Sequence, residues 1–308
     1  MNRREFLGGI GGLVAVSALP AVAASKRAGA MSVNYISLPI GAARPFSVFH
    51  ISDTHLKGLA PTDGEKVRRH LAPRFAGYDP EEALADSIRW AQRRKCDYLL
   101  HTGDLIDCAT DGNVALLKKF FGSADNILYA PGNHEYATDY AAPRPPQTEA
   151  EFRAVNTAKV QAAVPVDLQF HAQVVHGVNF VMMDDVYGTV SPAAVERFHA
   201  EAKKGLPIVL CQHVPFFSPG IALAHARSHT SDVALNELLV PLASRDFKEQ
   251  AEDKVTAEFI RYLKSEPLLK AILAGHYHCG MCDRFSPTAM QYVVGANFRH
   301  VGQEIMIY

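Results

Sequence analysis

The sequence carries almost no net charge, because 31 Lys and Arg residues nearly balance 32 Asp and Glu residues to give −1 at pH 7. This balance excludes a general attraction to nucleic acid or to an anionic membrane, so any recognition of phosphate must be local. Internal repeats and low-complexity linkers are also missing, which favours one mature domain. With 48% hydrophobic residues among 308, that domain can bury a substantial core.

Long apolar runs are also missing near the N-terminus, where residues 6–19 form a stretch shorter than the roughly 20 residues that cross a bilayer. This stretch follows a cationic start and precedes a region of small residues, as in a signal peptide. Arg3 and Arg4, followed by one acidic and two apolar residues, resemble the twin-arginine (Tat) signal of bacteria. We therefore expect residues 1–24 to be a cleaved Tat signal peptide and residues 25–308 to be the mature domain. An ordinary secretory signal and a retained anchor are the alternatives.

Export by the twin-arginine route would make the Tat machinery a partner of the precursor and the periplasm the destination of the protein. A cleaved signal would leave the mature protein without a stable membrane anchor. Because this route moves folded proteins, the resemblance also implies a passenger that already carries a metal or another cofactor.

Cysteine is scarce, with five residues in the chain, and an odd number cannot all pair. Cys279 and Cys282 follow a His-x-His pair, so a disulfide and a metal or redox motif are both open there. We expect Cys96, Cys108 and Cys211, which lie in or beside apolar runs, to fill the core.

Apolar runs of strand length alternate with amphipathic stretches of helix length along the mature chain, which predicts an α/β fold. Strand candidates are residues 46–52, 97–102, 126–131, 179–184, 207–212, 269–274, 290–295 and 304–308. Helix candidates are residues 81–94, 114–121, 149–163, 192–204, 231–246 and 250–265. Two stretches rich in Pro, Gly and charge, residues 57–79 and 136–147, are expected to be excursions from the core.

Five of the strand candidates are followed by polar residues that can bind metal ions. These are Asp53 and His55, Asp104, Asn133 and His134, His213, and the pair His276 and His278. Ligands of open α/β sheets bind just outside the carboxyl ends of the strands. Nitrogen and oxygen ligands of this kind suit two divalent or trivalent ions such as Fe, Zn or Mn.

A carboxylate shared between the two ions would place them about 3.5–4 Å apart, as in hydrolytic two-metal sites. Asp104 is the natural bridge, because it is the carboxylate at the end of the middle strand. Gly103 and Gly132 would let the backbone approach closely or adopt a positive φ beside it.

The motifs DTH, GD, GNHE, a lone His and GHYH, in this order over residues 53–278, resemble those of the calcineurin-like metallophosphoesterase family. The resemblance implies a four-layer αββα sandwich with a dinuclear metal site at the carboxyl ends of the strands. It also implies that one ion is held by Asp53, His55, Asp104 and His278, and the other by Asp104, Asn133, His213 and His276. His213 is assigned from its order in the chain and the preceding strand, and His225 and His229 are its competitors.

In such a site the paired ions would activate a water for in-line attack, so no covalent nucleophile is needed. His134 is the candidate catalytic residue, as proton donor to the leaving oxygen or as a stabiliser of charge in the transition state. Glu135 could orient His134, or it could be an exposed surface residue.

Asp107 stands where purple acid phosphatases, a related group, have a tyrosine ligand. We expect Asp107 to form a turn or to cap a helix, and contact with a metal-binding side chain is the alternative. His50 and His101 lie inside apolar runs, which indicates core histidines with satisfied hydrogen bonds.

These features predict an exported hydrolase that acts on small-molecule phosphate mono- or diesters. The alternative is an exported metal-binding or partner-binding protein that keeps the fold without hydrolysing anything. Selectivity would come from residues 57–79, 136–147 and 216–256, where no basic stripe interleaved with aromatic residues is present. That composition disfavours a nucleic acid partner.

Overall fold

The structure is a computed structural model that describes residues 30–123, 126–139, 147–229 and 245–308. The chain divides into two units, Met1–Ala30 and Met31–Tyr308, and every described helix and strand belongs to the second unit. The predicted signal peptide at 1–24, nearly all of the helix predicted at 231–246 and most of residues 136–147 lie outside the described residues. Among the described helices, none has the length and apolar character needed to cross a membrane.

Two mixed β-sheets form the centre of the second unit. In its described part, the first sheet has the order β1-β11-β2-β3-β4 and the second has the order β5-β6-β7-β8-β10-β9. The strands of the first sheet are β1 (Ser32–Leu38), β11 (Val301–Ile307), β2 (Phe46–Ile51), β3 (Tyr98–Thr102) and β4 (Ile127–Ala130). Those of the second are β5 (Phe170–Val175), β6 (Val178–Met183), β7 (Ile208–Cys211), β8 (Leu269–Ala274), β10 (Met290–Val293) and β9 (Met281–Arg284).

Parallel pairing aligns the strand ends within each sheet. Strands β2, β3 and β4 are parallel neighbours, and so are β6, β7, β8 and β10. Their carboxyl ends therefore lie along one edge of each sheet, which is where ligands of α/β proteins bind.

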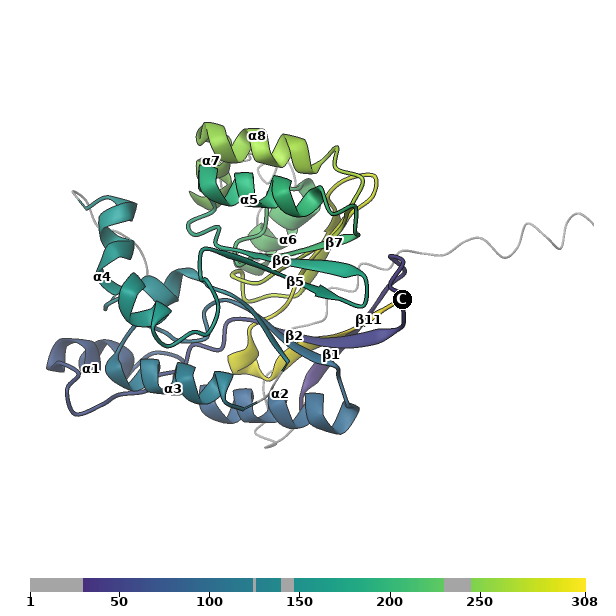
Figure 1. Cartoon of the computed structure of the whole chain (residues 1–308). Coiled ribbons are helices and arrows are strands. Elements are labelled where there is room, and N and C mark those ends of the chain that lie inside the picture. Colours follow the sequence, from purple (N-terminus) through teal and green to yellow (C-terminus); the bar gives the residue numbers. More distant parts are fainter. Residues whose placement is uncertain (1–29, 124–125, 140–146, 230–244) are drawn as a thin grey trace, which may run out of the picture. The chain divides into compact units, whose positions relative to one another are not determined.

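Helices cover the outer faces of both sheets (Figure 1). The described helices are α1 (Glu65–Leu71), α2 (Pro80–Arg94), α3 (Asp111–Phe121), α4 (Glu149–Gln161), α5 (Pro192–Ala202), α6 (Pro219–His229), α7 (Arg245–Glu252) and α8 (Lys254–Leu263). Two 3₁₀ turns, η1 (Asn133–Tyr136) and η2 (Asn297–Arg299), follow strand ends. Leu117 of α3 belongs to the same core cluster as Leu99 of the first sheet, and Phe198 of α5 to the same cluster as Leu210 of the second.

The inner faces of the two sheets pack directly on each other. Val48 and Leu100 of the first sheet belong to the same core cluster as Phe180 and Val209 of the second. The central strands are covered on both faces, and all six residues of β2 are buried. Burial on both faces explains why these strands appear in the sequence as continuous apolar runs. The predicted α/β sandwich of two sheets flanked by helices is confirmed.

Three strands were not predicted from the sequence: β1, β5 and β9. Strand β1 pairs only with β11 along one side, and its residue Tyr35 is 64% exposed. An edge strand of this kind buries few side chains, so its apolar pattern is weak.

Candidate metal centre

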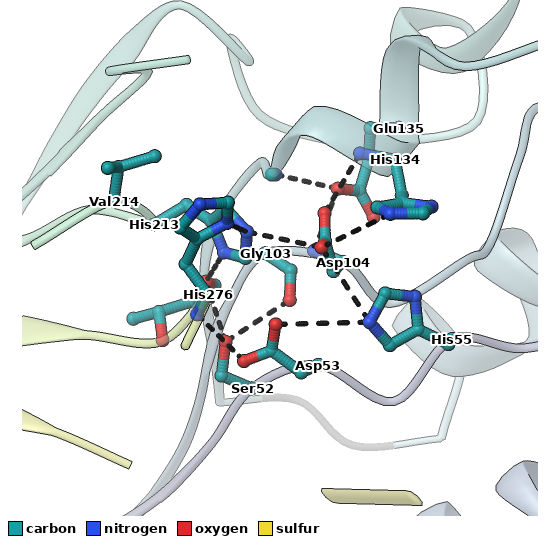
Figure 2. A network of polar contacts seen from close by, with 12 residues as sticks. Ser52, Asp53, His55, Gly103, Asp104, His134, Glu135, His213, Val214 and His276 are labelled. Carbon is teal, nitrogen blue, oxygen red and sulfur yellow. Dashed lines mark hydrogen bonds and ion pairs between the residues drawn. The ribbon is translucent and has the colours of Figure 1, made fainter. Parts of the chain in front are cut away.

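The five strand ends predicted to carry ligands meet in one place, as Figure 2 shows for Asp53, His55, Asp104, His213 and His276. The residues come from the ends of β2, β3, β7 and β8, two strands from each sheet. The contact between the two sheets therefore unites ligands that lie more than 200 residues apart in the chain.

A first cluster contains Asp53, His55 and His278, with one ligand atom of each close enough to hold a single ion. The Nε2 atoms of His55 and His278 lie 3.0 Å apart. His278 Nε2 lies 3.4 Å from Asp53 Oδ1, and His55 Nε2 lies 3.9 Å from the same oxygen.

A second cluster contains Asp104, His213 and His276. His213 Nε2 lies 3.2 Å from Asp104 Oδ2 and 3.2 Å from His276 Nδ1. The ring of His225, a competitor of His213, instead lies against the ring of Tyr277, with 3.9 Å between centroids and a tilt of 32°. The side chain of the other competitor, His229, lies outside the described residues.

Asp104 lies between the two clusters. Its Oδ2 atom is 3.2 Å from His213 Nε2 in the second cluster and 3.7 Å from His55 Nε2 in the first. Its Oδ1 atom accepts a hydrogen bond from the backbone N–H of His134 at 2.9 Å. One oxygen thus faces both clusters while the other is held by the backbone.

Three features of the donor set fit metal ions. Asp53 Oδ1 is buried without a hydrogen-bond partner, which is costly unless a cation binds it. Two nitrogens that each bind an ion at 2.0–2.1 Å lie about 3.0–3.4 Å apart, as the paired histidine nitrogens do here. Burial opposes a charged imidazole at His213, yet the charge of Asp104 raises the pKa of His213 to about 10. The carboxylates therefore create a potential that favours a cation.

Asn133 and His134 stand at the start of η1, and both are buried. Asn133 directly precedes the residue whose backbone binds Asp104, so it lies beside the predicted bridge. The positions of Asn133 and of the other six residues are consistent with metal binding. That each of the seven binds an ion stays a prediction.

The backbone is left-handed at most of the predicted ligands. Positive φ values occur at Asp53, His55, Asp104, His276 and His278, between 53° and 71°. Such values are uncommon for residues other than glycine, and their concentration at one site is typical of functional positions.

The two predicted glycines are required by the close approach of the chain. Gly103 has a φ of 91°, and a Cβ atom placed there would lie 2.6 Å from His213 Nδ1. A Cβ atom at Gly132 would overlap the carboxylate of Asp104. Larger residues at either position would displace the second cluster.

The Asp107 side chain neither stabilises a turn nor caps a helix, so that expectation was wrong, and the carboxylate contacts a predicted metal ligand, as in the alternative. Thr110 caps α3 instead, by accepting from the N–H of Asn113. The Asp107 carboxylate lies 3.0 Å from His55 Nδ1 and accepts two hydrogen bonds from Arg74 at 2.8 and 2.6 Å. Burial alone would raise its pKa, but hydrogen bonds from His134, His55 and Arg74 hold the pKa of Asp107 well below its usual range.

The contacts of Asp107 also orient His134. The Nδ1 atom of His134 lies 2.8 Å from the carbonyl oxygen of Asp107 and 3.1 Å from its Oδ1 atom. The Nε2 atom faces Asp104 Oδ2 at 4.0 Å. Burial would lower the pKa of His134, but Asp104 and Asp107 raise that pKa to about 9.

The Glu135 carboxylate does not bind the imidazole of His134, whose Nδ1 atom contacts Asp107, and it does not lie on the surface, so both expectations for it were wrong. It is fully buried and accepts backbone N–H groups from Asp104 at 2.9 Å, Leu105 at 2.8 Å and Gly132 at 2.6 Å. Burial and the nearby charge of Asp104 raise its pKa to about 7. Glu135 therefore holds together the two turns that carry Asp104 and His134.

Asp185 plays a similar part and was missed. It follows β6, is fully buried, and accepts the N–H groups of His213 at 3.0 Å and Val214 at 3.1 Å. Burial raises its pKa to about 7. The pattern that pointed to the other strand ends, an apolar run followed by an aspartate, is also present here in VMMDD.

The remaining predictions concern residues outside the clusters. His50 is buried and has a partner on each ring nitrogen, Thr102 at 2.8 Å and Gln303 at 2.6 Å, as predicted. His101 is also buried and contacts the hydroxyl of Thr54 at 2.9 Å, but its Nδ1 atom has no hydrogen-bond partner, so the prediction of satisfied hydrogen bonds was wrong for His101. No disulfide joins any of the five cysteines, all of which are described. Cys108 and Cys211 are buried as predicted, whereas Cys96 is half-buried and Cys282 is exposed.

Residues 46–280 match the profile of the calcineurin-like phosphoesterase family. Among solved structures, a dimetal phosphatase from Danio rerio superposes with a TM-score of 0.50 at 13% identity, covering 85% of this chain and 89% of that chain. A phosphopantetheinyl hydrolase from Mycobacterium tuberculosis superposes with a TM-score of 0.41 at 16% identity, covering 82% and 90% of the two chains. No significant match was found among curated protein sequences. Because the profile spans more than half of the residues and the Danio rerio structure shares the fold, the chain belongs to the calcineurin-like phosphoesterase family.

Proposed function

We propose that this protein is an exported phosphoesterase that uses two metal ions, of Fe, Mn or Zn, to hydrolyse small-molecule phosphate mono- or diesters. The observation that carries the proposal is the position of Asp104, whose Oδ2 atom faces both ligand clusters. A carboxylate shared in this way is the arrangement of hydrolytic two-metal sites. Family membership supports the reaction class.

Two bound ions would supply Lewis acidity that activates water at neutral pH and polarises the phosphoryl group. The side chains of the protein would bind and orient the ions and supply a proton. Asp53, Asp104 and the histidines hold the ions, and Asp107 keeps His55 with its Nε2 atom toward the first cluster. His134, whose Nδ1 atom is held by Asp107 while its Nε2 atom faces the clusters, can donate a proton to the leaving oxygen.

The substrate would approach from the side of His276 and His278. Their side chains are 21% and 31% exposed, whereas those of Asp53, His55, Asp104 and His213 are at most 2% exposed. The ions would therefore be shielded on the sheet side and accessible on one side only.

The excursion at residues 57–79 packs on Phe298, whose ring lies 5.3 Å from that of His278 on the open side, and this contact supports its predicted role in selectivity. The ring of Phe75 lies 4.6 Å from the ring of His55 and 4.4 Å from that of Phe298 between centroids. Tyr78, 38% exposed, packs on Phe298 at 5.2 Å. Phe75 also has a φ of 53°, a strained value for a bulky residue that often marks functional segments.

The test is hydrolysis of p-nitrophenyl phosphate and bis-p-nitrophenyl phosphate by the protein loaded with Mn²⁺, Zn²⁺ or Fe. We expect turnover of at least one ester at about 1 s⁻¹ or faster, the usual range for enzymes, and its loss when a chelator removes the ions. The preferred ester would distinguish a monoesterase from a diesterase. A protein that binds two ions but hydrolyses neither these esters nor alkyl phosphate or pyrophosphate substrates would instead be a binding protein.

Export is proposed on the N-terminal sequence alone. We expect the double substitution Arg3→Lys and Arg4→Lys to leave the precursor in the cytoplasm, because the Tat machinery reads the arginine pair rather than positive charge. The measurement is the amount of mature protein in periplasmic and cytoplasmic fractions of a bacterial host. Substitution of Lys26 by arginine, beyond the predicted cleavage site, is the control. Normal periplasmic accumulation of the double variant would rule out Tat export.

A further inference from the structure

Asp246, in the first turn of α7, contacts the side of His276 that faces away from the second cluster. Asp246 Oδ2 lies 3.1 Å from His276 Nε2, and it also accepts a hydrogen bond of 3.5 Å from the hydroxyl of Tyr277. On the opposite side of the ring, His276 Nδ1 lies 3.2 Å from His213 Nε2. The imidazole is therefore placed between a carboxylate and the predicted ion.

This placement decides which nitrogen of His276 is available to a metal. A neutral imidazole has one N–H group and one lone pair, and an ionised carboxylate can only accept. The contact with Asp246 thus favours the proton on Nε2 and leaves the lone pair of Nδ1 directed at the second cluster. Carboxylate partners of this kind also raise the basicity of a ligating histidine.

Two other histidines of the centre have partners on the nitrogen that faces away from the clusters. His55 Nδ1 contacts Asp107 at 3.0 Å, and His213 Nδ1 contacts the carbonyl oxygen of Thr102 at 2.7 Å. Both partners belong to β3 or to the turn that follows it. The partner of His276 comes instead from a helix outside the sheets.

We propose that Asp246 is the positioning residue of His276, and that α7 therefore forms part of the second metal site. The proposal deepens the proposed function and rests on its dinuclear centre, but it does not depend on which ester is hydrolysed. It assigns a role in metal binding to α7, which lies in a segment that the sequence connected with substrate selectivity.

The docking of α7 does not depend on the Asp246 carboxylate. Phe247 is 5% exposed, and its ring packs on those of Phe217 at 5.4 Å and Tyr277 at 5.7 Å. Gln250 accepts from the N–H of Phe217 at 2.8 Å and donates to the carbonyl oxygen of Pro215 at 2.9 Å. Removal of the Asp246 carboxylate should therefore leave α7 in place.

The experiment is equilibrium dialysis of the full mature protein against buffered Mn²⁺ or Zn²⁺, followed by counting of the ions bound per chain. We expect Asp246→Ala to weaken binding of the second ion about 10–100-fold, as is usual when the partner of a ligating histidine is lost, with the first ion unaffected. Asp246→Asn keeps an acceptor oxygen but loses the charge, so its effect should be smaller. Glu249→Gln, which removes the ion pair with Arg245 on the same helix, is the matched control and should bind both ions normally.

A double-mutant comparison separates positioning from general support of the fold. In a His276→Ala background, Asp246→Ala should cause no further loss of affinity, because its only route to the ion is gone. Equal weakening of both ions, an equal effect of Glu249→Gln, or a further loss in the His276→Ala background would overturn the assignment. A wild-type protein that binds one ion would overturn the dinuclear centre itself, whereas two bound ions without hydrolysis would contradict only the proposed reaction.

Discussion

Replacement of Asp104 by asparagine should remove at least one of the two metal ions and slow the hydrolysis of phosphate esters by at least about 10³-fold. Asp104 is 1% exposed, and its Oδ2 atom lies 3.2 Å from His213 Nε2 and 3.7 Å from His55 Nε2. Asparagine has nearly the same shape, but a neutral amide cannot share one negative oxygen between two cations. The measurements are the number of ions per chain, by elemental mass spectrometry, and kcat with saturating metal.

Asp167→Asn is the matched control, because it makes the same chemical change at a surface ion pair with Arg197. It should keep both ions and full activity. An Asp104→Asn protein that binds two ions with wild-type affinity would show that Asp104 does not bridge them.

Replacement of His134 by alanine should lower kcat for an alkyl phosphate ester about 10²–10⁴-fold, the usual contribution of a general acid, and for a nitrophenyl ester much less. A nitrophenolate departs without a proton, whereas an alkoxide is far more basic and needs one. The structure supports a proton donor here, because Asp107 holds Nδ1 at 2.8 Å while Nε2 faces the clusters. The measurement is kcat for both esters at equal metal content.

Metal content should stay near two ions per chain in His134→Ala, since His134 is not assigned as a ligand. His171→Ala, on β5 and outside the described clusters, is the control and should leave both esters unaffected. If His134→Ala slows the two esters by the same factor with both ions retained, His134 stabilises charge on the phosphoryl group and is not the acid.

The sequence by itself determined the α/β class, most of the central strands and the ligand types. These features could be predicted because they depend on short-range patterns. Apolar runs such as residues 46–51 are followed by polar residues, and parallel strands place their carboxyl ends at one edge of the sheet. The glycines beside Asp104 could also be predicted, because close approach of the backbone restricts the residue type.

The tertiary structure alone decided the roles of Asp107, Glu135 and Asp246. Each is a single carboxylate whose sequence neighbours do not reveal its partner: Asp107 binds Arg74 from the excursion, Glu135 binds backbone N–H groups 30 residues away, and Asp246 meets His276. The sequence alone does not distinguish a carboxylate that caps a helix from one that faces water or binds an imidazole. Its role is set by which donors the folded chain brings within hydrogen-bond distance, and by the burial that makes each of those contacts necessary.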